Sequence, residues 1–171
     1  MNSAQALRRE AKKLISRYLP DVDMSTDPRN VRIDVYKLAE RIGIEVKNSM
    51  FSDEIFGLLV KKDNNPVIGV NCKHHPHRQR FTVAHELGHY ILHGTETIHY
   101  DVGGEPLYFR SDSIYYADER EANRFADELL MPEHLVSRCI EAGTCTVEKL
   151  AEIFDVSEDA MRYRLINLGY M

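Results

Sequence analysis

Hydrophobic residues recur at helical spacing in two stretches of the N-terminal third of the chain. Between residues 3 and 18 they fall three or four positions apart, opposite a basic face, and Pro20 ends the pattern. Farther along, Asp34 can cap a helix whose apolar residues again share one face, and Gly43 suits the left-handed position that follows a helix. The pattern therefore predicts two amphipathic helices before residue 44.

Three short segments after Gly43 have the composition of β-strands. A strand begins at 44–46, and the segments 55–61 and 67–71 are rich in β-forming residues on either side of a turn-forming sequence. The short turn predicts that the last two segments pair as a hairpin. We therefore expect a small sheet of about three strands.

The two strongest helical signals lie on either side of a segment without clear periodicity. The first helix is expected at about 77–93 and the second at about 119–131, where Pro132 ends it. Residues 94–117 between them carry mixed charges and a Gly-Gly-Glu-Pro sequence, which favours a flexible connector or lid. Beyond Pro132 the sequence predicts two or three short helices.

Composition narrows the class of protein. The 171 residues are 43% hydrophobic and 29% charged, as in ordinary globular proteins, and no apolar run is long enough to cross a bilayer. The N-terminus shows no secretory signal, so we expect a cytoplasmic protein without a membrane partner. The three cysteines argue against a disulfide framework, and the net charge of −5 does not suit a polyphosphate backbone.

Most of the eight histidines fall between residues 74 and 99, and two of them form the sequence His85-Glu86-Leu87-Gly88-His89 in the first strong helix. Histidines four residues apart lie about 40° apart around a helix, so His85 and His89 can bind one metal ion. Glu86 lies about 100° from His85, which is too far for an equal ligand but close enough to reach a water on the same metal. The motif predicts a metal clamp with Glu86 as the general base.

A catalytic zinc site needs three protein ligands and one open position, so a third ligand is expected from another segment. In the second strong helix Glu119 lies about 50° from the centre of the apolar stripe and Glu121 about 110° away, which favours Glu119. Asp118 and Glu121 also have the spacing of a capping box, which would give Glu121 a structural task instead. Asn123, one turn after Glu119, can hydrogen-bond and orient a ligand, whereas His93 lies too far along its helix to be a favoured ligand.

Three segments carry a resemblance to a known family: RQRFTVAHELGHYILH at 78–93, EREANRFA at 119–126 and LLMP at 129–132. They resemble the ImmA/IrrE metallopeptidases, over about residues 30–170. The resemblance implies an α+β, zincin-like metallopeptidase domain with a small β-sheet, an active-site helix pair and a C-terminal helical segment. It also implies that His85, His89 and Glu119 hold zinc and that Glu86 activates water. Members of the family commonly cut helix-turn-helix repressors, so the expected partner is a repressor or antitoxin that serves as substrate.

On this basis we expect one metallopeptidase domain over 1–171. It comprises an N-terminal helix and linker (1–29), a catalytic core (30–132) and the C-terminal helical segment (133–171). The expected reaction is metal-assisted peptide hydrolysis with Zn²⁺, for which Mn²⁺ is an alternative. A donor that stabilises the oxyanion is also needed, and the sequence does not choose among the candidates Tyr90, His99, Tyr115, Tyr116 and Arg80.

The C-terminal segment has a helix-turn-helix pattern at 146–165, with a turn at Asp155 and Ser157 as the cap of the second helix. Direct DNA binding is not expected, because Glu158 and Asp159 occupy the helix start that would meet the DNA. The alternative function is a transcriptional regulator or partner-binding module with a structural metal. A third hypothesis is a latent protease whose segment 94–117 opens only with an activating partner.

Overall fold

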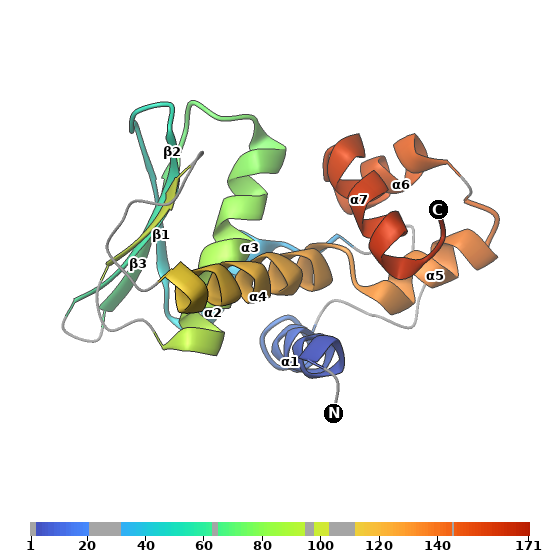
Figure 1. Ribbon diagram of the computed structural model, residues 1–171, viewed down its shortest axis with the longest axis horizontal. Helices are drawn as coiled ribbons and strands as arrows, with labels where there is room; N and C mark the ends of the chain where they lie inside the picture. The colour runs from blue at the N-terminus through green and yellow to red at the C-terminus, as the bar shows by residue number, and fades with distance from the viewer. Residues whose placement is uncertain (1–2, 21–31, 63–64, 95–97, 103–111, 145) are drawn as a thin grey trace. The chain divides into compact units, whose positions relative to one another are not determined.

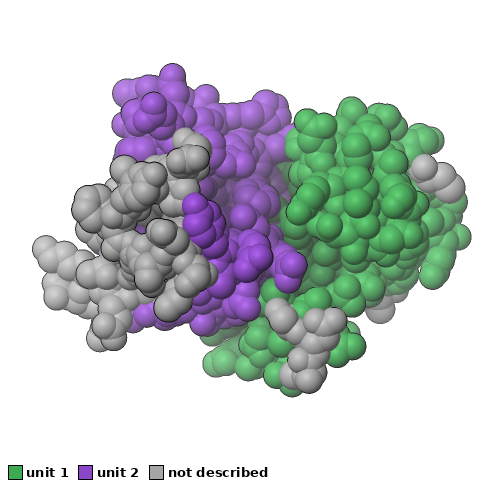
Figure 2. Space-filling model, in the orientation of Figure 1, with its two compact units in different colours: residues 1–34, 127–171 green, residues 35–126 purple. Residues whose placement is uncertain are grey.

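The computed structural model describes residues 3–20, 32–62, 65–94, 98–102, 112–144 and 146–171 (Figure 1). Its elements are α1 (Ser3–Tyr18), α2 (Val35–Ile42), β1 (Glu45–Ser49), β2 (Ile55–Lys62), β3 (Asn65–Asn71), α3 (Pro76–His93), β4 (Ile98–Val102), α4 (Asp112–Leu130), α5 (Glu133–Glu141), α6 (Val147–Phe154) and α7 (Glu158–Leu168). They form two compact units, which Figure 2 colours separately: residues 1–34 with 127–171 (unit 1), and residues 35–126 (unit 2). The expected α+β class is confirmed, and the single domain stays a prediction.

Unit 2 is built on a mixed sheet with the strand order β1-β3-β2-β4. β1 runs parallel to β3, while β2 pairs antiparallel with both β3 and β4. The predicted hairpin is therefore confirmed as β2 and β3. The expected three strands are joined by a fourth, because 94–117, predicted to be a connector or lid, contains β4.

α3 runs through the interior of unit 2, where it packs against the sheet and α2. The His75 side chain accepts a hydrogen bond from the His77 amide (3.2 Å), Pro76 occupies the first turn, and Gly94 ends the helix with a left-handed backbone. The residues from Thr82 to His89 are all buried, including both histidines and the glutamate of the motif. Buried polar side chains at this density need partners, so this stretch of α3 indicates a functional site.

α4 begins earlier than the sequence pattern indicated. It starts at Asp112, so Asp118 and Glu121 lie inside the helix. The capping-box interpretation of these two residues is therefore wrong, because its geometry exists only at a helix start. The added turns lie in a stretch without clear helical periodicity, which is why the pattern gave no signal there.

The described residues of unit 1 form helices joined by short connections. α1 buries Leu7, Ala11 and Ile15, and the predicted short helices after Pro132 are confirmed as α5, α6 and α7. Thr146 and Ser157 cap α6 and α7 through their hydroxyl oxygens. These caps and the left-handed Asp155 between the two helices account for the helix-turn-helix pattern of the sequence.

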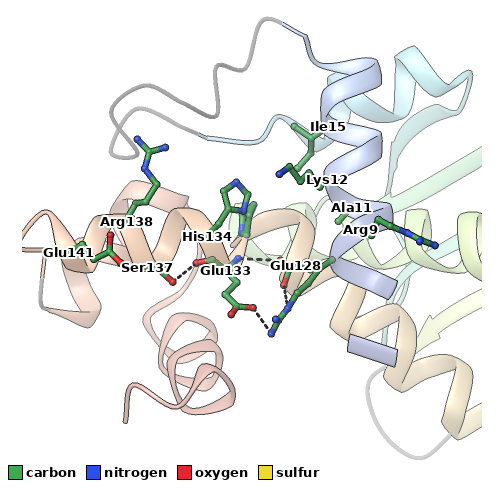
Figure 3. A pocket seen from close by; sticks show the side chains of 12 residues that line it. Arg9, Ala11, Lys12, Ile15, Glu128, Glu133, His134, Ser137, Arg138 and Glu141 are labelled. Carbon is green, nitrogen blue, oxygen red and sulfur yellow. Dashed lines mark hydrogen bonds and ion pairs between the residues drawn. The ribbon is translucent and has the colours of Figure 1, made fainter. Parts of the chain in front are cut away.

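Charged side chains of α1 form ion pairs with other elements of unit 1. Arg8 on α1 forms an ion pair with Glu133 on α5, and its Nε lies 3.9 Å from Glu128. These groups border an open pocket of about 620 Å³ lined by residues of α1, α5 and the end of α4 (Figure 3). Within the described part of the chain, no helix is long and apolar enough to span a membrane.

Candidate metal centre

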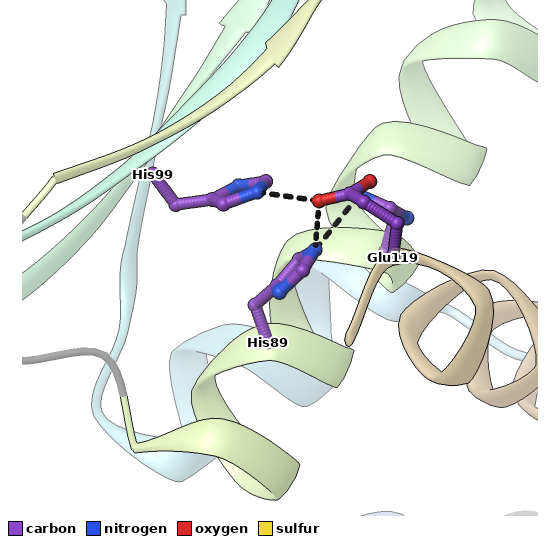
Figure 4. A group of neighbouring side chains, drawn as sticks. His89, His99 and Glu119 are labelled. Atoms are coloured by element: carbon purple, nitrogen blue, oxygen red, sulfur yellow. Dashed lines mark hydrogen bonds and ion pairs between the residues drawn. The ribbon is translucent and has the colours of Figure 1, made fainter. Parts of the chain in front are cut away.

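Three histidines and one glutamate from separate elements of unit 2 point toward one another, three of them labelled in Figure 4. His85 and His89 lie one turn apart on α3, His99 comes from β4, and Glu119 comes from α4. One donor atom from each of the four lies within 4.8 Å of the others. The structure thus brings together His85, His89 and Glu119, which the sequence nominated as ligands, and adds His99.

The carboxylate of Glu119 is at the centre of this cluster. Its Oε1 lies 2.8 Å from Nε2 of His99 and 3.1 Å from Nε2 of His89. Its Oε2 lies 3.4 Å from Nε2 of His85. The two Nε2 atoms of His85 and His89 are 3.1 Å apart.

The chemistry and spacing of these donors fit a zinc ion. Imidazole nitrogen and carboxylate oxygen are common zinc ligands, and bonds of about 2.0–2.1 Å in a tetrahedron place neighbouring ligand atoms about 3.3 Å apart. The separations of 3.1 Å between the Nε2 atoms of His85 and His89 and 3.1 Å between Nε2 of His89 and Oε1 of Glu119 are close to this edge length. The other carboxylate oxygen, Oε2, is the one that lies 3.4 Å from Nε2 of His85. These three side chains are therefore placed to bind one divalent ion.

Glu86 lies beside the cluster and is completely buried. Its Oε2 is 3.0 Å from Nδ1 of His99, whereas its Oε1 is buried without a hydrogen-bond partner. Burial raises the pKa of Glu86 above its usual range, although the hydrogen bond with His99 opposes the rise. A carboxylate with one unpaired oxygen and a raised pKa is suited to accept a proton.

The electrostatics of the cluster favour a cation. Burial lowers the pKa of His89 to about 3, and the neighbouring His99 and His85 act in the same direction, so the His89 imidazole stays neutral. Burial opposes a charge on Glu119 as well, but hydrogen bonds from the histidines hold the pKa of Glu119 well below its usual range. Burial also disfavours charge on His99, yet its bonds to Glu119 and Glu86 raise the pKa of His99 to about 10.

Two further side chains support the site from outside. Oδ1 of Asn123 lies 3.0 Å from Nδ1 of His85, which matches the orienting contact predicted for Asn123. Asp101, which sequence reasoning missed, lies in a second cluster with His85 and Glu86 and accepts a hydrogen bond from Thr82 (3.3 Å). The signal that could have found Asp101 is its spacing of two from His99, which places both on one face of a strand.

Neither ligand cluster found among the described residues includes the other glutamate and histidine that the sequence analysis considered as ligands. Glu121 belongs to neither cluster, and Nδ1 of His93 lies 3.5 Å from Asp118. Among the oxyanion candidates, Tyr90 is half-buried, Tyr116 is 51% exposed and Arg80 is buried. The side chain of Tyr115 lies outside the described residues.

Comparison with known proteins identifies relatives of the chain. The model of the IrrE N-terminal-like domain, peptidase family M78, matches residues 39–166. A radiation response metalloprotease IrrE from Deinococcus radiodurans is 33% identical over 102 residues, which are 58% of this chain and 30% of that protein. An uncharacterized immunity region protein 2 of Bacillus phage phi105 is 31% identical over 105 residues, or 60% of this chain and 61% of that protein.

A solved structure, a Mycobacterium tuberculosis transcriptional regulator, has a similar fold. It superposes with a TM-score of 0.62 at 19% identity, over 94% of this chain and 46% of that one. The chain spans about a third of the length of the IrrE proteins that it matches from Deinococcus radiodurans and Deinococcus deserti, 30% and 35% respectively.

Proposed function

Because the chain belongs to the family of IrrE N-terminal-like domains, we propose that it is a zinc-dependent endopeptidase that hydrolyses a peptide bond in a protein substrate. The observation that carries the proposal is the juxtaposition of His85, His89 and Glu119 with the buried, unpartnered Oε1 of Glu86. Three clustered metal ligands beside a base with one unpartnered oxygen are the parts that metal-assisted hydrolysis requires.

His85, His89 and Glu119 would hold the ion, with Zn²⁺ favoured by the donor set and Mn²⁺ as an alternative. When bound, zinc supplies Lewis-acid polarisation of the scissile carbonyl and makes a water molecule more acidic. Asn123 fixes the orientation of the His85 ring through Nδ1, so Nε2 of His85 stays directed toward Glu119.

Glu86 moves the protons in this mechanism. Its unpartnered Oε1 accepts a proton from the attacking water, and the same oxygen then delivers that proton to the nitrogen of the leaving amine. The burial that raises the pKa of Glu86 makes it a stronger base than an exposed glutamate and a usable acid afterwards. The surroundings of α3 exclude bulk water from this transfer, because the motif is buried along its length.

The substrate that we propose is a helix-turn-helix repressor or an antitoxin, and the setting is the cytoplasm. The family resemblance supports such a substrate, as does the phage relative, whose name places it in an immunity region. Direct DNA binding by this chain is not proposed, because the first turn of α7 carries exposed Glu158 and Asp159.

The test is a cleavage assay with purified protein, stoichiometric zinc and a helix-turn-helix repressor encoded beside it, read by mass spectrometry of the products. The wild type should cut the substrate, and Glu86→Gln should bind equal zinc yet lose cleavage by about 100-fold or more, since a positioned base contributes about 10²–10⁴-fold. Glu54→Gln, an exposed glutamate of unit 2, is the matched control. Cleavage at the wild-type rate by Glu86→Gln would remove Glu86 from the mechanism. Salt-dependent DNA binding without proteolysis would favour the regulator instead.

A further inference from the structure

We propose that His99 is a fourth protein ligand of the metal and that the conformation described here is a closed, latent form of the site. The inference rests on the proposed function, whose three ligands His85, His89 and Glu119 leave one position open. It adds a means of regulation. The carbonyl of a peptide substrate could reach the fourth coordination position of the metal only after His99 has left that position.

The two ring nitrogens of His99 are placed as those of a metal ligand are. Histidines that bind metals usually donate the other ring N–H to a carboxylate or carbonyl, which fixes the ring and makes the ligand more basic. Nδ1 of His99 lies 3.0 Å from Oε2 of Glu86, and Nε2 is directed into the ligand cluster, 2.8 Å from Oε1 of Glu119. The whole residue is 8% exposed, so this arrangement is held inside unit 2.

The ring of His99 also lies against that of His89. The two imidazoles are stacked, with centroids 3.7 Å apart and an angle of 28° between the ring planes. Their Nε2 atoms approach the same oxygen, Oε1 of Glu119, at 2.8 and 3.1 Å. Both histidines therefore direct Nε2 to the same carboxylate oxygen, which places Nε2 of His99 among the proposed ligand atoms.

With His99 as a fourth protein ligand, the metal site would have no open coordination position. Four protein ligands complete a tetrahedral zinc site, as in structural sites, whereas catalytic sites keep one position for water or substrate. The hydrogen bond from His99 also occupies Oε2 of Glu86. His99 would therefore block both the fourth coordination position of the metal and one carboxylate oxygen of the general base. Removing His99 would free both groups together.

The strand that carries His99 lies at an edge of the sheet and pairs with an irregular register. Among the described strands β4 pairs with β2 alone, and the pairing has a register irregularity between Ile55 and Gly57. Displacing an edge strand breaks a ladder on one side only. An activating partner could therefore withdraw His99 without dismantling α3 or α4.

The number of imidazoles on the metal tests the inference directly. X-ray absorption at the zinc edge of the wild-type protein should show three imidazoles and one carboxylate, and His99→Gln should show two imidazoles. His93→Gln is the matched control, because Nδ1 of His93 contacts Asp118 instead, and it should keep three. Since the wild-type count needs no variant, two imidazoles in the wild type would overturn the fourth ligand even if His99→Gln fails to fold.

A second experiment tests whether His99 closes the metal site. Calorimetry would measure the affinity of the zinc-loaded protein for a small hydroxamate. If His99 must leave the metal before the hydroxamate can bind, His99→Gln should bind the hydroxamate at least about tenfold more tightly than the wild type. In the variant no binding energy is spent on shifting the protein from the closed to the open form. Equal or weaker binding would overturn the latent form. Neither result depends on cleavage, whereas a wild-type protein that holds no stoichiometric zinc would defeat the proposed function itself.

Discussion

Gly88 on α3 lies against the backbone of Ala122 on α4. A Cβ built at Gly88 would be 3.1 Å from Cα of Ala122 and 3.2 Å from its carbonyl oxygen. The helices approach this closely only because Gly88 has no side chain. Since Gly88 precedes His89 and Ala122 follows Glu119 by one turn, the same contact sets the distance between the two halves of the metal centre.

Gly88→Ala should therefore weaken zinc binding while leaving every ligand in place. The new methyl group meets backbone atoms, so α3 and α4 must separate by a few tenths of an ångström. Overpacking costs about 1–3 kcal/mol, against a gain of about 1 kcal/mol from replacing glycine in a helix. We expect a lower zinc affinity by competition with a chelator and a net loss of stability of about 0–2 kcal/mol, the difference between these two effects. Arg124→Ala, on the exposed face of α4, is the control, and equal affinities in both variants would contradict the spacing role of Gly88.

The variants Glu119→Gln and Glu121→Gln test which of the two glutamates is the third metal ligand. Glu119 contacts three histidines, whereas Glu121 belongs to neither ligand cluster found among the described residues. Glu119→Gln should lower zinc affinity by about 100-fold or more, since even groups that only orient a ligand account for about 10–100-fold. Glu121→Gln should bind zinc as the wild type does. Isothermal titration would show the assignment to be wrong if the two results were reversed.

The sequence predicted the helix pair because helical periodicity carries the information. In α3 the spacing of four between His85 and His89 determines that both face one point, and the apolar stripe of α4 determines which glutamate faces inward. These arguments need no knowledge of the strands. The bounds of α3 were predicted to within one residue. Glu119 was predicted on the side of α4 that faces the histidines, as the structure has it.

The sequence offered His99 only as one of several candidate oxyanion donors, and its position among the ligands was beyond this reasoning for a physical reason. The segment 98–102 alternates apolar and polar residues, which is the strand pattern, but it is only five residues long and sits in a polar connector. Polar positions of such a strand ordinarily face solvent. Here His99 faces a buried cluster of carboxylates and imidazoles, so its environment depends on α3 and α4 rather than on its own neighbours.

Arg164→Met should destabilise unit 1 strongly. Arg164 is buried, forms an ion pair with Glu128 and donates from Nε to the carbonyl oxygen of Met131 (3.0 Å). Breaking one side of a buried pair costs about 3–5 kcal/mol, because the remaining charge stays buried. Arg162→Met, at an exposed position of the same helix, should change the free energy of unfolding by less than about 0.5 kcal/mol in urea denaturation. Equal stabilities of the two variants would show that the Arg164 pair contributes little.

Asp127→Asn should make the protein more stable at neutral pH but not in acid. Burial raises the pKa of Asp127 to about 6, with Glu128 adding to the rise and Arg164 opposing it. Between the unfolded pKa of about 3.9 and this value the folded state holds a proton that the unfolded state has lost, so stability falls as the pH rises through that window. A rise of about two units corresponds to about 3 kcal/mol, which Asp127→Asn should recover at pH 7 and not at pH 4. Urea denaturation of this variant and of the exposed control Glu152→Gln at both pH values measures the difference, and a gain that is the same at pH 4 and pH 7 would rule out a cost of ionising Asp127.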